Sequence, residues 1–141
     1  MKEINWFKIA AARGINLEPL SNLMEAYVKM YKFYGEAAAD WLIEYAIAEG
    51  KDINNYKCLF SIAVEKYDEG MDKYHHDHAL AWDYTQNALS TIIECTYYNL
   101  KYEPEQFGRE WSKRKVGLDD VFIDMLEQHI KDNPDFDCLG D

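Results

Sequence analysis

Apolar residues between positions 56 and 74 recur at intervals of four, three, four, four and three. They are Tyr56, Phe60, Ala63, Tyr67, Met71 and Tyr74. Because an α-helix has 3.6 residues per turn, this spacing places all of these side chains on one face. The opposite face carries mainly acidic residues. The pattern predicts a long amphipathic helix over about 54–75, with Asp52 or Asn54 as its N-terminal cap.

The same spacing recurs along most of the chain, and no segment shows the strict alternation of a half-buried strand. We expect further helices over about 3–12, 19–34, 36–49, 79–100 and 118–131, and a short one over 104–113. Gly35 and Gly50 suit helix ends, although the pattern leaves open whether Gly35 breaks a helix or only kinks it. The sequence therefore predicts an all-α single domain over residues 1–134, a compact bundle of five to seven helices. The helices over 54–75 and 79–100 should form its central antiparallel pair, and residues 135–141 a short acidic tail.

The chain has 26 Asp and Glu residues against 15 Lys and Arg residues, which gives a formal net charge of −11. Hydrophobic residues make up 48% of it and aromatic residues 15%, so it can bury enough apolar surface to fold. The negative charge disfavours direct binding to nucleic acid or to membranes and favours a basic protein partner. The small basic cluster Lys113-Arg114-Lys115 is expected to complement nearby carboxylates or a helix C-terminus.

The three cysteines, Cys58, Cys95 and Cys138, lack the Cys-x-x-Cys spacing of a zinc site, and their number is odd. We expect reduced thiols, with Cys58 and Cys95 acting as small buried apolar side chains within helices. The N-terminal residues do not follow the pattern of a signal peptide, and no apolar run reaches membrane-spanning length. These features predict a cytoplasmic protein.

One segment holds the residue types that bind metal ions, namely Asp72, His75, His76, Asp77 and His78. Asp72 could share a helix face with His75 or His76, and His78 lies close by in the sequence. A di-iron bundle would need a second Glu-x-x-His element, yet the one other histidine is His129. A polar turn that joins two helices is the favoured interpretation, and no cofactor is expected.

Two carboxylate pairs, Glu65 with Asp68 and Glu69 with Asp72, lie on adjoining turns of the predicted helix over 54–75 and could bind a hard cation such as Mg²⁺. They fall on its polar face, and no second helix carries a matching pair, so the sequence favours a surface acidic stripe. No serine lies in a glycine-flanked elbow and no phosphate-binding glycine loop is present. The sequence therefore identifies no catalytic residue, and an enzyme is the less favoured class.

Aromatic residues at helical spacing belong more often to a core than to a binding surface. We expect most of five such residues to be buried, namely Tyr27, Tyr31, Trp41, Tyr67 and Tyr74. Tyrosines away from the main apolar faces can instead add rigid contacts to an interface. The candidates for this role are Tyr84, Tyr98 and Tyr102.

The leading hypothesis is a non-enzymatic acidic module that binds and blocks a basic surface of another protein, such as a nuclease or another nucleic-acid-binding protein. Immunity proteins, antitoxins and phage-encoded inhibitors of host defence use this strategy, in some cases by mimicking nucleic acid. The alternatives are a metal-dependent helical-bundle enzyme that uses the 72–78 cluster, and a structural subunit that forms homo-oligomers. We name the set Glu65, Asp68, Glu69, Asp72, Asp77 and Asp83 the acidic ridge. The remaining predicted contact residues are Tyr84, Asp135, Asp137 and Asp141.

Overall fold

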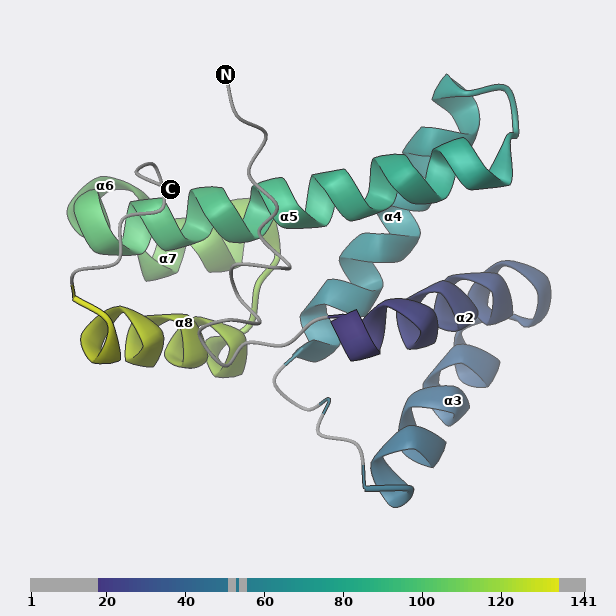
Figure 1. Cartoon of the computed structure of the whole chain (residues 1–141), viewed down its shortest axis with the longest axis horizontal. Coiled ribbons are helices and arrows are strands. Elements are labelled where there is room, and N and C mark those ends of the chain that lie inside the picture. The colour runs from purple at the N-terminus through teal and green to yellow at the C-terminus, as the bar shows by residue number, and fades with distance from the viewer. Residues whose placement is uncertain (1–17, 51–52, 54–55, 135–141) are drawn as a thin grey trace.

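The computed structural model describes residues 18–50, 53 and 56–134, and this part of the chain is helical without a β-strand (Figure 1). The longer helices are α2 (Glu18–Tyr34), α3 (Glu36–Ala48), α4 (Lys57–Lys73), α5 (His78–Tyr102) and α8 (Asp120–Asp132). Between α5 and α8 lie the short helices α6 (Pro104–Phe107) and α7 (Arg109–Trp111) and the π-helix η2 (Ser112–Val116). The all-α prediction is confirmed. The helix expected over 3–12 and the acidic tail lie outside the described residues.

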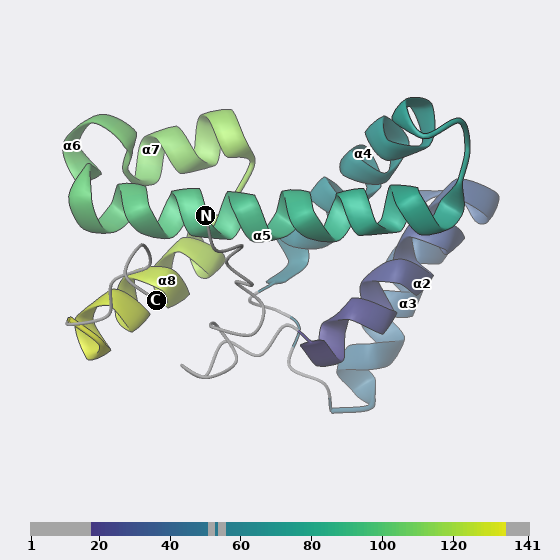
Figure 2. The same cartoon turned by 45° about the horizontal axis from the view of Figure 1, so that its top comes forward.

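The helices pack largely in the order in which they are connected. Contacts join α2 to α3 and to α4, α4 to α5, and α5 to α8, and the α4 and α5 pair has the most extensive contact. Figures 1 and 2 show α5 running along the molecule, with α2 and α3 near its start and α6, α7 and α8 near its end. The turn between α4 and α5 therefore lies at one end of the fold, beside the C-terminal half of α2.

The predicted face of α4 provides a large part of the core. Tyr56, Phe60 and Ala63 are buried together with Tyr67, and the face continues into the partly buried Met71. On the other side of the helix the predicted polar residues are exposed. Periodicity therefore predicted both faces of α4 correctly.

In α3 the predicted buried face is wrong. The apolar stripe expected from the sequence comprised Ala37, Trp41, Leu42, Tyr45 and Ala48. The structure instead buries Ala39, Ile43 and Ala46, while Trp41 is 56% exposed and Tyr45 is 52% exposed. Apolar residues occur on most sides of this helix, so periodicity could not select the buried face. The contact between α3 and α2 helps to decide which face is buried.

Glycine and aspartate residues set several helix boundaries. Gly35 has a φ of 93° and separates α2 from α3, so it breaks the helix instead of kinking it. Asp77 caps α5 and Asp119 caps α8, each accepting a hydrogen bond from a backbone N–H three residues later. The predicted caps of α4, Asp52 and Asn54, lie outside the described residues.

The segment after α5 is more broken than the single short helix predicted over 104–113. A Cβ atom at Gly108 would lie 2.2 Å from the carbonyl oxygen of Pro104, so the tight junction between α6 and α7 requires glycine. The Arg109 guanidinium then contacts three carboxylates of α8, those of Asp120, Asp124 and Glu127. These contacts raise the pKa of Arg109 and join α7 to α8.

The basic cluster at 113–115 lies on the π-helix η2. The ammonium group of Lys113 is 3.2 Å from a carboxylate oxygen of Asp120, which confirms that part of the cluster complements a nearby carboxylate. Cys58 is partly buried, whereas Cys95 is exposed, so the prediction of a buried thiol is wrong for Cys95. Among the described helices, none is both long enough and apolar enough to span a membrane.

Candidate functional site

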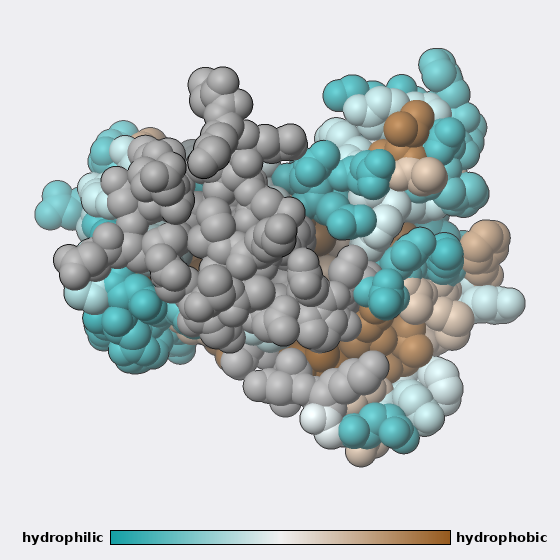
Figure 3. Space-filling view, in the orientation of Figure 1, coloured by the Kyte–Doolittle hydropathy of each residue, from teal (hydrophilic) through white to brown (hydrophobic). Residues whose placement is uncertain are grey.

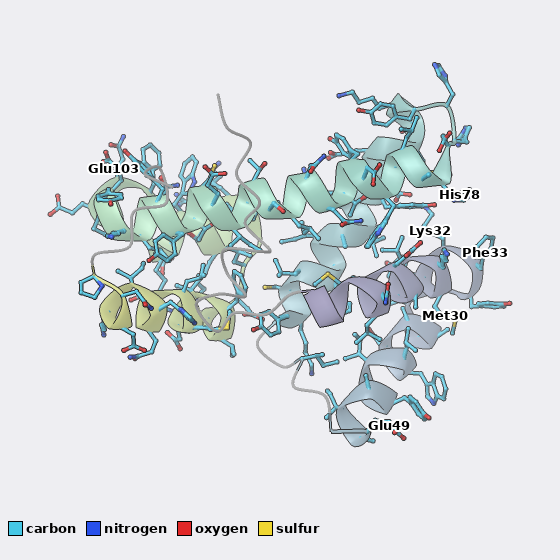
Figure 4. The ribbon with its side chains drawn as sticks, viewed as in Figure 1. Met30, Lys32, Phe33, Glu49, His78 and Glu103 are labelled. Carbon is cyan, nitrogen blue, oxygen red and sulfur yellow. The ribbon has the colours of Figure 1, made fainter. Side chains whose placement is uncertain are left out.

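Two adjoining hollows lie between the C-terminal half of α2 and the turn that joins α4 to α5. Their volumes are about 580 and about 680 Å³. Both are lined by Lys29 and Phe33 from α2, by Tyr67 from α4 and by His78 from the start of α5. Figure 4 shows Phe33 and His78 at the same end of the molecule, on the two elements that face each other there. We call the two hollows together the cleft.

The walls of the cleft are largely apolar. Val28 and Trp82 line the first hollow, and Met71 lines the second. Figure 3 shows hydrophobic surface where α2 and α3 lie and mainly hydrophilic surface at the α4–α5 turn. Phe33 is 72% exposed although it lines both hollows, so a large apolar side chain faces solvent at their shared wall. Exposed apolar surface with a polar border is typical of a binding site.

Tyr67 and His78, which line both hollows, contact each other and link α4 to α5. The Tyr67 hydroxyl lies within hydrogen-bonding distance of Nδ1 of His78, and the two rings are stacked with centroids 6.1 Å apart. Burial, followed by the nearby carboxylates of Glu25 and Asp68, raises the pKa of Tyr67. The phenol therefore stays protonated near neutral pH and can donate its hydrogen bond to the imidazole.

Charged side chains border each hollow in a similar way. At the first, Lys29 is 3.3 Å from Glu25, and Asp83 lies nearby without an ion-pair partner among the described residues. At the second, Lys32 forms an ion pair with Asp68, and Asp72 has no such partner within the same residues. Asp83 at the first hollow and Asp72 at the second are therefore the lining carboxylates without an ion-pair partner among the described residues, and Lys29 lines both hollows.

All six carboxylates of the acidic ridge are exposed, as predicted, but they differ in their contacts. Asp68 is paired with Lys32, and Asp77 serves as the cap of α5. Glu69 accepts a hydrogen bond of 2.9 Å from the Tyr84 hydroxyl and lies 3.3 Å from the Lys66 ammonium. The hydrogen bond from Tyr84 is the main cause that lowers the pKa of Glu69; desolvation opposes it, and Lys66 also lowers the pKa.

The remaining ridge residues are Glu65, Asp72 and Asp83, which have neither an ion-pair nor a hydrogen-bond partner in the described part of the chain. The hydroxyl of Tyr84, a predicted interface residue, donates a hydrogen bond to Glu69, and the Tyr84 ring contacts the ring of Tyr74. The predicted contacts at 135, 137 and 141 lie outside the described residues.

The histidine cluster occupies the turn between α4 and α5, as the favoured interpretation predicted. His75 and His76 have φ values of 55° and 66°, and His78 is engaged by Tyr67. Within the described residues, no group of three or more His, Cys, Asp or Glu side chains is arranged to hold a metal ion. Asp72 lines the second hollow of the cleft.

Sequence reasoning missed Phe33 as a surface residue and misplaced Trp41. Of the five aromatic residues expected to be buried, Tyr27 and Tyr67 are, Tyr31 and Tyr74 are partly buried, and Trp41 is exposed. Trp41 stacks instead on Tyr45, with ring centroids 5.5 Å apart. The one available signal for Phe33 is its position near the end of α2, away from the main apolar stripe.

Comparison of the chain with protein family models, with curated protein sequences and with solved structures finds no match. The function is therefore argued from the geometry and charge of the cleft.

Proposed function

We propose that this protein is an acidic binding module that occupies a basic surface of a partner protein and blocks it. The observation that carries the proposal is the position of Asp72 and Asp83, two exposed and uncompensated carboxylates, each at the border of an apolar hollow. Glu65 adds a third exposed carboxylate on the outer face of α4. The α4 and α5 pair, which we predict to be antiparallel, is the scaffold that presents them.

Charge and apolar surface have different roles in such a module. A net charge of −11 attracts a basic partner at long range and raises the association rate. Apolar side chains at the contact then release water and supply much of the affinity. A basic groove that normally binds nucleic acid fits this combination, so the proposed partner is a nuclease or another nucleic-acid-binding protein and the proposed effect is inhibition.

The proposal is tested by replacing the three uncompensated ridge carboxylates with their amides, in the variant Glu65→Gln/Asp72→Asn/Asp83→Asn. Immobilised protein captures partners from a lysate of the cells in which it is naturally made. We expect one basic protein to be retained by the native chain and lost by the variant. Its association rate constant should fall by about tenfold or more, since electrostatic steering contributes on that scale.

A matched control carries the same charge change elsewhere, in the variant Glu49→Gln/Glu103→Gln/Glu105→Gln. These side chains are exposed, and Figure 4 shows Glu49 and Glu103 far from the cleft. The control should retain the partner with a nearly unchanged association rate. Equal losses in both triple variants would show that net charge alone attracts the partner, and equal retention by both would contradict the proposal.

A further inference from the structure

We infer that the cleft binds a basic amphipathic segment of the partner protein, with one apolar side chain in each hollow and a Lys or Arg beside each of Asp72 and Asp83. The inference rests on the proposed function and identifies the part of the partner that is bound. It assigns the cleft a single occupant, a segment in which cationic and apolar side chains alternate in space.

The size of the two hollows and the exposure of Phe33 favour an occupant with apolar side chains. Each hollow falls within the range of about 300–1,000 Å³ that is typical of small-molecule sites, so it has ample room for a large apolar side chain. Phe33 lines both hollows and leaves most of its surface in solvent, so an occupant would cover it from two sides. Covering a mostly exposed aromatic ring is favourable because it removes apolar surface from water.

The charged residues at the border of the cleft favour an occupant with cationic side chains. Its lining residues include the four carboxylates of Glu25, Asp68, Asp72 and Asp83 and the two ammonium groups of Lys29 and Lys32. Four negative and two positive charges leave an excess of two negative charges. Lys29 is paired with Glu25 and Lys32 with Asp68, so Asp72 and Asp83 are the carboxylates of the cleft that have no ion-pair partner among the described residues.

This arrangement discriminates against other occupants. A neutral apolar segment would remove water from Asp72 and Asp83 without offering a compensating charge, which is unfavourable. An acidic segment or a nucleic acid would in addition be repelled by the charge of the whole chain. A segment with two suitably placed cations avoids both penalties.

The inference is tested with two fluorescein-labelled model peptides and fluorescence anisotropy. The first contains Leu and Lys in an amphipathic pattern, and the second has every Leu replaced by Ser, so that the charge is unchanged. We expect the Leu/Lys peptide to bind at least about tenfold more tightly, which corresponds to about 1.4 kcal/mol. Its binding should also shift the backbone amide resonances of Phe33 and His78 in the native protein.

Two matched pairs of variants locate the binding. Phe33→Ser should weaken binding of the Leu/Lys peptide by about tenfold, whereas Tyr34→Ser, at a neighbouring and 75% exposed residue outside both hollows, should leave it unchanged. Asp72→Asn/Asp83→Asn should weaken binding more than the distant Glu49→Gln/Glu103→Gln. Circular dichroism checks that each variant is folded.

The outcomes separate this inference from the proposed function. Equal binding of the two peptides, or equal effects of Phe33→Ser and Tyr34→Ser, would overturn the inference while partner capture by the ridge still held. The opposite result is peptide binding that depends on Phe33 with equal partner capture by the native chain and by Glu65→Gln/Asp72→Asn/Asp83→Asn. It would support the inference about the cleft and overturn the proposed function.

Discussion

His129 is a partly buried residue whose protonation opposes folding. Its Nδ1 atom is buried and has no hydrogen-bond partner among the described residues. Protonation would place a charge and a donor on this nitrogen, so burial lowers the pKa of the imidazole, while nearby Asp132 acts in the opposite direction. The neutral ring is therefore the form that the folded state favours.

We predict that the free energy of unfolding falls as the pH decreases from about 7.5 to about 5.5. The folded-state pKa lies below the unfolded value, so the unfolded chain binds more protons over this range and is favoured by acid. The contribution of His129 is fully present above the unfolded pKa and is lost as the pH falls through the folded pKa. Urea unfolding at both pH values measures it, and His129→Gln should reduce the difference. An unchanged difference in that variant would show that other groups cause the pH dependence.

The close contact between α4 and α5 depends on Gly70, which has no Cβ atom. A Cβ atom at Gly70 would lie 3.0 Å from the Cα atom and 3.1 Å from the carbonyl oxygen of Ala81, and both of these are backbone atoms. Gly70 is buried in the last turn of α4 and Ala81 lies in the first turn of α5, so the backbones of the two helices approach closely near the turn that joins them. Beside this contact, Glu69 of α4 accepts a hydrogen bond from the Tyr84 hydroxyl of α5.

Gly70→Ala should therefore destabilise the protein although alanine is the better helix former. The gain in helix propensity is about 1 kcal/mol, whereas forcing a methyl group into a packed interface costs about 1–3 kcal/mol. We expect a net loss of about 1 kcal/mol in the free energy of unfolding, measured by urea titration. The control Ser61→Ala lies on the exposed face of the same helix and should not destabilise it. A more stable Gly70→Ala variant would show that α4 and α5 can move apart enough to fit the methyl group without a loss of free energy.

Elements differ in how well their sequence predicts their packing. In α4, apolar and acidic residues occupy opposite faces, so the core side of the helix follows directly from periodicity. In α3 the charged residues are few and apolar residues occur on every side, so its orientation depends on which face fits α2. The exposed stack of Trp41 on Tyr45 is a consequence of that fit.

At the scale of the whole molecule, acidic charge is in large excess over basic charge. The 15 Lys and Arg residues, some of them in ion pairs such as those of Arg109 with α8, offset part of the 26 acidic charges and leave a net charge of −11. Like charges on a compact surface repel one another, and folding brings them closer together. Salt should therefore affect stability through screening of this repulsion.

We predict that the thermal midpoint rises as the salt concentration increases from about 10 mM to about 150 mM, where the Debye length shortens from about 30 to about 8 Å. Differential scanning calorimetry measures the change, and sodium chloride and choline chloride should act alike if screening is the cause. A midpoint that falls with salt would show instead that the native ion pairs outweigh the repulsion.

The five longer helices and the acidic face of α4 follow from residue spacing, because helix formation and amphipathicity are local properties of a segment. The division of the segment after α5 into α6, α7 and η2 did not follow from it. The cleft does not follow in this way. Phe33, Tyr67, His78 and Asp83 come from three helices, and their proximity depends on how α2 packs beside the α4–α5 turn. Charge likewise predicted which carboxylates are exposed, but which of them remain unpaired depends on cations that folding brings close, such as Lys32 beside Asp68. Local spacing determines a helix and its faces, whereas a site formed between helices depends on contacts among residues far apart in the chain.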